Sequence, residues 1–186
     1  MASTRPSHLI RTAAALAAAG LALAGCSAQP GTAATVNGTT ISENEVDEAT
    51  SEFIALTGQE DVTPVAVLNT LVEGELLDPI ATEAGYAVSD AEVEQFFLEQ
   101  ASLAGATQRP DVESEAFLDL GRYLLQYNEI YASPDAQTIF AEAETARQEA
   151  DIEVNPRYAQ TDDAGAFVPT VRDWIHQGEP APTPAG

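Results

Sequence analysis

The sequence predicts a mainly α-helical fold, a bundle of about five helices closed by a small β-sheet. Two observations support this fold class. Apolar residues recur at helical spacing in successive segments between residues 42 and 150. Short segments with strand-like patterns flank them at residues 34–36 and 151–155. We expect these N-terminal and C-terminal strands to pair and so to join the two ends of the bundle.

The first strand and helix carry clear local signals. Asn37-Gly38 favours a tight hairpin turn, so a return strand is expected over residues 39–41. Ser42 and Glu45 match a capping box, in which both side chains accept hydrogen bonds from main-chain N–H groups at a helix start. The apolar stripe of the helix that follows consists of Val46, Ala49, Phe53 and Leu56.

The second helix is the most hydrophobic of the chain. Thr63 and Pro64 suit the N-cap and the first helical position. Because Pro79 has no N–H group, we expect it to kink this helix or to end its first part. Gly85 is a natural residue just past the helix end, and Tyr86 can supply the apolar contact that follows it. The main apolar face carries Val65, Leu68, Val72 and Leu76.

Three further helices are expected. Ser89 and Glu92 form a second capping box. The helix that they open carries Val93, Phe96 and Phe97. A fourth helix over about 113–132 has a stripe formed by Phe117, Leu120, Leu124, Tyr127 and Tyr131. The last helix begins at Ser133-Pro134, and one of its faces carries Ile139, Ala143, Ala146 and Ala150.

Residues 1–25 have the parts of a secretory signal peptide. Arg5 and Arg11 form a basic region, and the Ala/Leu-rich run after them has ~11 residues, whereas a membrane span needs ~20. The sequence LAGC at 23–26 resembles the lipobox of bacterial lipoproteins. The resemblance implies cleavage before Cys26 and diacylglycerol on its sulfur, which would anchor the protein at the extracytoplasmic face of the cell membrane. We expect no other cofactor.

Changes in composition divide the chain. A short linker rich in Ala, Pro and Gly follows the lipidated cysteine. The C-terminal residues are again rich in Pro, Ala and Gly and have no apolar periodicity, which is typical of disorder. The predicted organisation is a signal peptide at 1–25, a linker at 26–33, a helical domain at 34–160, a C-terminal extension at 161–176 and a disordered tail at 177–186.

The chain is strongly acidic. It has 7 arginines, no lysine and 30 acids, a formal net charge of −23. Loss of residues 1–25 would leave 5 of the arginines and all 30 acids, a net charge of −25. This charge excludes nucleic acid as a partner, because binding it requires basic residues. Acids spread over several helices indicate a solvated surface, and attraction of basic polypeptides is the alternative interpretation.

Four segments, taken in order, resemble the N-terminal domain of the SurA/PrsA family of extracytoplasmic chaperones. The first three are VNGTTIS at 36–42, VLNTLV at 67–72 and VSDAEV at 88–93. The fourth, IEVNPRY at 152–158, resembles the terminal strand of a lipoprotein branch with such domains. The resemblance covers roughly residues 33–160. It implies a SurA N-terminal-domain-like fold and a chaperone-like, polypeptide-binding function.

The chain departs from the full family in one respect. Full members also carry parvulin-type prolyl isomerase domains with paired histidines, but the helices between residues 89 and 150 leave no room for one. His176 is the one histidine after residue 25. We therefore expect no prolyl isomerase activity and no enzyme. No hydrolase triad and no Cys/His cluster for zinc is available either, so no catalytic or metal site is expected.

Aromatic residues are the candidates for binding client polypeptides. The candidate site consists of Phe96, Phe97, Tyr123, Tyr127 and Tyr131. Core packing is the alternative for Phe117, Tyr127 and Tyr131, which share a stripe, whereas Tyr123 lies off the stripe and is expected to be the most exposed. The competing function is a structural or adaptor lipoprotein that binds one specific envelope partner. The sequence leaves the client and the oligomeric state open.

Overall fold

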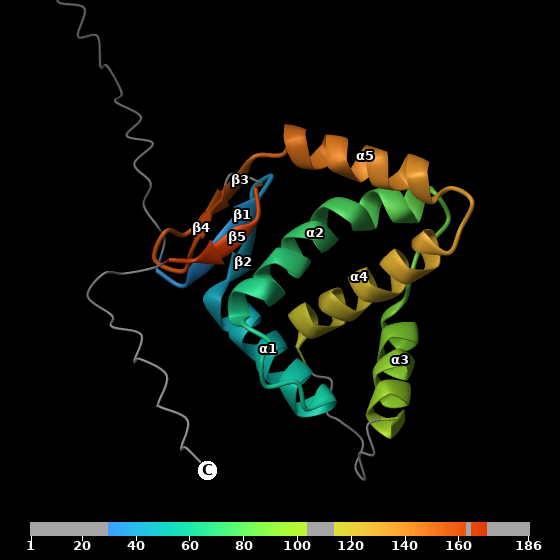
Figure 1. Ribbon diagram of the computed structural model, residues 1–186, viewed down its shortest axis with the longest axis horizontal. Coiled ribbons are helices and arrows are strands. Elements are labelled where there is room, and N and C mark those ends of the chain that lie inside the picture. The colour runs from blue at the N-terminus through green and yellow to red at the C-terminus, as the bar shows by residue number, and fades with distance from the viewer. Residues whose placement is uncertain (1–29, 104–113, 163–164, 171–186) are drawn as a thin grey trace, which may run out of the picture.

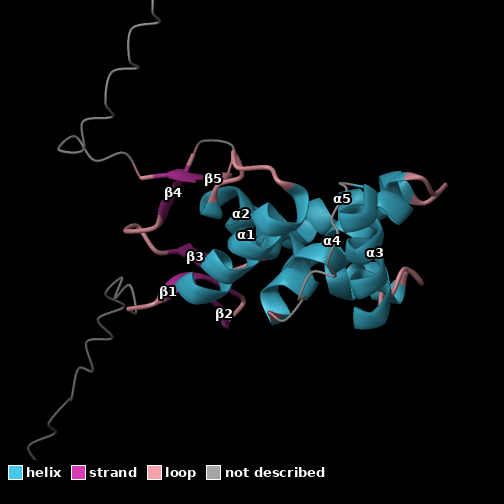
Figure 2. Cartoon of the chain, turned by 90° about the horizontal axis from the view of Figure 1, so that it is seen from below, coloured by secondary structure: helices cyan, strands magenta, loops and turns pink. Residues whose placement is uncertain are grey.

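Strands gather at one end of the molecule, and helices extend from them (Figures 1 and 2). A computed structural model describes residues 30–103, 114–162 and 165–170. The helices of this described part are α1 (Glu43–Thr57), α2 (Pro64–Glu83), α3 (Asp90–Leu103), α4 (Glu115–Tyr131) and α5 (Ala136–Glu149). Its strands are β1 (Thr32–Val36), β2 (Thr39–Ser42), β3 (Ile152–Val154), β4 (Ala159–Thr161) and β5 (Phe167–Pro169). The mainly helical fold class with a small sheet is confirmed.

Several sequence predictions concern other parts of the chain. The signal peptide at 1–25, the lipidation residue Cys26 and the tail at 177–186 lie outside the described residues. Within the described segments, no helix combines the length and the apolar character that crossing a bilayer requires.

The three-stranded sheet joins the two ends of the bundle as predicted. Its strand order is β2-β1-β3, and both pairs are antiparallel. Asn37 and Gly38 have positive φ values of 50° and 89°, which fits the predicted tight turn between β1 and β2. The Asn37 N–H also donates to the carbonyl of Asp151 at 2.9 Å, and the Asp151 N–H donates to the Asn37 side chain at 3.0 Å. One turn therefore serves both strand pairs.

Side-chain caps fix the starts of α1, α2 and α3. The Ser42–Glu45 capping box is present, with the Ser42 N–H donating to the Glu45 carboxylate at 2.6 Å. The same exchange links Ser89 and Glu92 before α3. Thr63 caps α2 by accepting from the Ala66 N–H at 3.2 Å. These contacts satisfy N–H groups that a helix start leaves without intrahelical partners.

Helix α2 is the central element of the fold, and Figure 1 shows it between α4 and α5. Its Leu68 and Val72 are fully buried. The helix continues past Pro79 to Glu83, so of the two predicted effects of this proline, an end of the helix is not observed. Its end matches prediction, because Gly85 has a φ of 94° and the Tyr86 N–H donates to the carbonyl of Ala81 at 2.8 Å.

A short hairpin, β4-β5, extends the domain beyond the boundary predicted at residue 160. Phe167 is 5% exposed and belongs to the main core, although it falls in the predicted C-terminal extension at 161–176. Asn69 of α2 holds β5 through both main-chain groups of Phe167. The Asn69 side chain donates to the Phe167 carbonyl at 2.9 Å and accepts from its N–H at 3.0 Å. Strands of three residues carry too little alternation to be recognised in a sequence.

Candidate functional site

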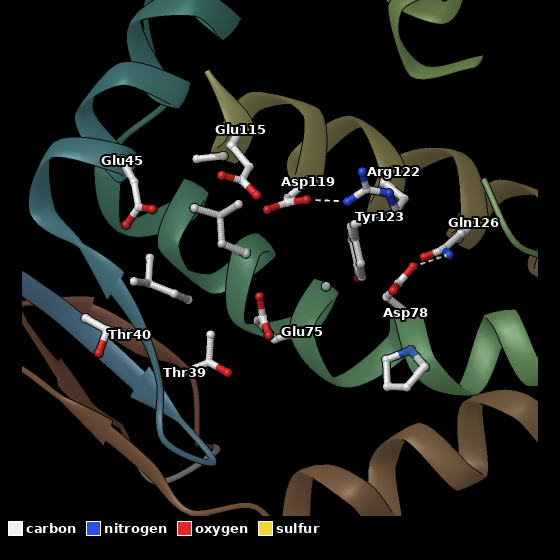
Figure 3. A pocket seen from close by; sticks show the side chains of 15 residues that line it. Thr39, Thr40, Glu45, Glu75, Asp78, Glu115, Asp119, Arg122, Tyr123 and Gln126 are labelled. Atoms are coloured by element: carbon white, nitrogen blue, oxygen red, sulfur yellow. Dashed lines mark hydrogen bonds and ion pairs between the residues drawn. The ribbon is translucent and has the colours of Figure 1, made fainter. Parts of the chain in front are cut away.

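Two neighbouring hollows lie along α2 and α4. The first, here called the acidic cavity, has a volume of about 430 Å³ and lies among β2, α1, α2 and α4 (Figure 3). The second, here called the tyrosine groove, has a volume of about 170 Å³ and is lined by Glu73, Leu77, Tyr123, Tyr127, Phe140, Ala143 and Glu144. Because Tyr123 lines both, the two hollows are adjacent.

Three tyrosines of α4 form a ladder along the tyrosine groove. Tyr123, Tyr127 and Tyr131 are spaced four residues apart, which places them on one face of the helix. Ring centroids are 5.9 Å apart for the first pair and 6.3 Å for the second, and Phe140 of α5 lies 5.0 Å from Tyr127. Tyr127 is 41% exposed and Tyr131 71% exposed. An aromatic surface of this kind suits contact with apolar side chains of a partner.

The structure reverses the predicted exposure of these tyrosines. Tyr123, expected to be the most exposed, is half-buried, whereas Tyr127 and Tyr131, assigned to the core stripe, are exposed. The reason is that α4 serves two cores. Phe117 and Leu120 lie in the main core, but further along the helix Ile130 packs in a second cluster with Leu77, Ala81 and Ile139. The buried face of α4 therefore shifts along its length.

The two phenylalanine candidates belong to the packing of α3. Phe97 is 1% exposed and stacks on Phe117 of α4 at 4.1 Å, so its ring belongs to the core and does not face solvent. Phe96 is partly buried and packs against the main core, with its ring 5.4 Å from that of Phe97. Of the five candidates, only the tyrosines come together beside a groove.

Carboxylates from three helices line the acidic cavity. Figure 3 shows them around the cavity, and they are Glu45 of α1, Glu75 and Asp78 of α2, and Glu115 and Asp119 of α4. Arg122 is the one cationic side chain among its described lining residues. It forms ion pairs with Asp119 and, at 2.5 Å, with Asp90. The cavity therefore retains a large excess of negative charge.

Partial burial and repulsion by neighbouring carboxylates both change the pKa of Glu75. Desolvation raises the pKa of its carboxyl above the ordinary value, and the neighbouring charges of Asp119, Asp78 and Glu45 raise it further. A cation placed among these carboxylates would relieve the repulsion between them.

Gln126 closes one end of the acidic cavity. It is fully buried, and its Nε2 donates to Asp78 Oδ1 at 2.7 Å. Its Oε1 is buried and accepts no hydrogen bond. Leaving a buried acceptor unpaired costs about 1–3 kcal/mol, so this atom marks a place where a donor would be stabilised. No sequence pattern pointed to Gln126, because a glutamine in a helix is ordinarily expected to be exposed.

An ion pair borders the tyrosine groove. Arg147 of α5 pairs with Glu73 of α2 and also donates to the carbonyl of Gly165 at 2.5 Å. Burial raises the pKa of Glu73, against the opposing effect of Arg147. Burial likewise raises the pKa of Tyr123, and the charge of Glu73 adds to this. Tyr123 therefore stays a neutral hydrogen-bond donor at neutral pH.

Across the described ranges, no three acidic, histidine or cysteine side chains are grouped so that they could hold a metal ion. Comparisons with protein-family models, with curated proteins and with solved structures give no match. The site is therefore interpreted from its own geometry, and the resemblance to SurA/PrsA proteins stays a prediction.

Proposed function

We propose that this chain is a lipid-anchored, extracytoplasmic protein whose SurA N-terminal-domain-like bundle binds polypeptide segments in a chaperone-like way, without prolyl isomerase activity. The lipobox at 23–26 supports the membrane anchor on Cys26. The domain then acts close to the plasma membrane, where it would meet exported, incompletely folded polypeptides.

The observation that carries this proposal is the exposed tyrosine ladder beside a groove. Tyrosine rings offer large, stiff contact areas with a polar end, and they bind varied side chains at a low entropic cost. Tyr127 and Tyr131 stand open to solvent, and Phe140 and Leu77 form the apolar wall next to them. A groove with such a lining suits an extended or helical segment that carries apolar side chains.

The charge of the domain defines the partner further. Glu73 and Glu144 line the tyrosine groove, and the whole chain carries a net charge of −23. Complementary charge attracts basic polypeptides and repels acidic ones. The occupant proposed for the groove is therefore a polypeptide segment that combines apolar and basic side chains.

The anchor is tested by Cys26→Ser, which removes the sulfur that lipid would occupy. We expect the variant to leave the membrane fraction, as measured by fractionation and immunoblotting of cells. A variant that stays membrane-bound as firmly as the unchanged protein would contradict the lipoprotein assignment.

The binding activity is tested by suppression of client aggregation, followed by light scattering at low and moderate salt. We expect the native protein to suppress aggregation of an unfolded client at both salt levels, and the double variant Tyr127→Ser, Tyr131→Ser to lose most of this effect. Leu103→Ser is the matched control, because Leu103 is an apolar residue 82% exposed at the end of α3. Suppression of aggregation that occurs only at low salt would indicate that the acidic surface attracts basic clients and that the groove does not bind them. Absence of suppression would favour an adaptor that binds one folded partner.

A further inference from the structure

The acidic cavity holds hydrogen-bond acceptors that the described residues leave without donors. We propose that it binds the ammonium or guanidinium group of a basic side chain on the polypeptide that occupies the tyrosine groove. The inference rests on the function proposed above and adds to it a specificity site, lined by Glu75, Asp78, Asp119 and Gln126. A client would then be selected for a lysine or arginine beside its apolar side chains.

The first acceptor is the amide oxygen of Gln126. Because the Gln126 Nε2 must face Asp78 to donate to it, the amide orientation is fixed and Oε1 is the atom without a partner. The side chain is fully buried and lines the cavity, where Figure 3 shows it beside Asp78 and Tyr123. Because Oε1 is itself buried, a donor that enters this end of the cavity reaches it only when the Gln126 side chain shifts, with Nε2 still donating to Asp78.

The second and third acceptors belong to Glu75. Proline has no N–H group, so Pro79 removes the donor that the Glu75 main-chain carbonyl would otherwise meet one turn later in α2. Both residues line the cavity. Within the described residues the Glu75 carboxylate forms no hydrogen bond or ion pair, and the charges nearest to it are other carboxylates. A group with several N–H donors and a positive charge matches this set of oxygens.

The size of the cavity suits an organic group. The cavity measures about 430 Å³, within the range of pockets that hold organic groups. A long side chain with a terminal cation fills such a space, and its methylenes contact the apolar lining of Ile41 and Leu71.

The position of Tyr123 links this cavity to the proposed function. Its ring lines the acidic cavity on one side and the tyrosine groove on the other. A polypeptide on the ladder therefore lies next to this cavity, and a basic side chain that enters the cavity packs on the face of the Tyr123 ring. Binding in the cavity and binding on the ladder reinforce each other, because one chain makes both contacts.

The experiment measures binding of matched fluorescent peptides to the native protein by anisotropy. The peptides share apolar residues and differ at one central position, which is lysine, arginine or norleucine. Norleucine has nearly the length of lysine without its charge. The protein variant is Glu75→Gln, which removes one cavity charge and keeps the shape. Glu83→Gln is the control. Glu83 lies exposed on the same helix, and its substitution also removes one negative charge.

We expect the lysine and arginine peptides to bind about ten-fold or more tightly than the norleucine peptide. The Glu75→Gln variant should lose most of this preference, and Glu83→Gln should keep it. Equal binding of all three peptides, or a preference that both variants keep, would overturn the cavity assignment while leaving polypeptide binding intact. No binding of any peptide would reject the proposed function itself.

A last arm tests a free amine as the occupant, with n-butylammonium as the probe and thermal stability as the measurement. If n-butylammonium stabilises the protein only when Glu75 is present, and the lysine peptide does not displace it, the cavity binds small amines. That outcome would overturn the polypeptide assignment. Displacement of n-butylammonium by the lysine peptide, and not by the norleucine peptide, would support it.

Discussion

Gly121 lies where α4 passes closest to α3. A Cβ atom built on it would lie 2.5 Å from Phe97 Cε2 and 2.7 Å from Phe97 Cζ, and would also clash with Val93. Both of these neighbours are buried and belong to the main core, so neither can move without disturbing it. The absence of a side chain at Gly121 is therefore what allows the Phe97–Phe117 stack.

We expect Gly121→Ala to destabilise the protein by about 1–3 kcal/mol, because overpacking forces side chains out of their preferred rotamers. The measurement is the free energy of unfolding from denaturant titration. Gly74→Ala is the matched control in α2, since its Cβ would meet only Tyr123 Cβ at an ordinary 3.5 Å. That control should gain up to about 1 kcal/mol from helix propensity. Equal effects of the two changes would contradict the proposed close packing.

The raised pKa of Glu75, again a property of a single residue, predicts how the stability of the protein depends on pH. Its folded-state pKa is raised, so the folded protein favours the protonated carboxyl more than the unfolded chain does. The stabilising contribution of this carboxyl is complete below its ordinary pKa of about 4.5 and is lost as pH rises through the higher folded value. Glu75→Gln, which resembles the protonated form, should therefore melt higher than the unchanged protein near neutral pH.

The melting-temperature advantage of Glu75→Gln should shrink as pH falls towards the ordinary glutamate pKa. Thermal unfolding across that pH range measures it, with Glu83→Gln as the control for loss of one charge. A melting-temperature advantage that stays constant with pH would show that the raised pKa of Glu75 is not the cause of the advantage.

At the scale of elements, the hairpin β4-β5 depends on a single side chain of α2. Asn69 satisfies the N–H and the carbonyl of Phe167 together, and it also donates to the carbonyl of Val65 at 3.0 Å. Asn69→Ala should cost about 1–3 kcal/mol because it leaves main-chain groups beside the core without partners. Hydrogen exchange should rise first in residues 159–169.

Thr70→Ala is the comparison variant for Asn69. The Thr70 hydroxyl donates only within its own helix, to Ala66 at 3.2 Å, so its loss should leave exchange in the hairpin unchanged. If the hairpin is protected from hydrogen exchange as strongly in Asn69→Ala as in Thr70→Ala, the burial of Phe167 alone holds the hairpin in place.

Local chemistry explains which elements were predictable from the sequence. Asn37-Gly38, the two capping boxes and the Gly85 helix end each work through neighbouring residues, so their patterns predict structure directly. The sheet across the two ends was also predictable, because the strand at 151–155 changes period after a helix. The β4-β5 hairpin was missed because its stability comes from Asn69, about a hundred residues away in the sequence.

The candidate site was predictable only in part, for the same reason. The tyrosine spacing on α4 is visible in the sequence, but its exposure depends on which core each turn of α4 faces. The acidic cavity combines α1, α2 and α4, and acids are so frequent in this chain that no single pair indicates a site. Gln126 becomes informative only when its buried, unpaired oxygen is seen.

At the scale of the whole molecule, negative charge opposes compaction. The net charge of −23 is spread over a chain of 186 residues, and the described part holds five carboxylates around one cavity. Self-repulsion of this kind is weaker in the expanded, unfolded chain than in the folded state. Salt shortens the reach of the repulsion, from about 30 Å at 0.01 M to about 8 Å at 0.15 M.

We therefore expect the melting temperature to rise by a few degrees between these two ionic strengths, on the order of ~1 kcal/mol of stabilisation. Sodium chloride and tetramethylammonium chloride should act alike, because screening depends on ionic strength and not on the identity of the cation. Tetramethylammonium has no N–H donor, so n-butylammonium at the same ionic strength should stabilise further if the acidic cavity selects donors. A melting temperature that falls with salt would mean that attractive ion pairs, such as those of Arg122 and Arg147, outweigh the repulsion.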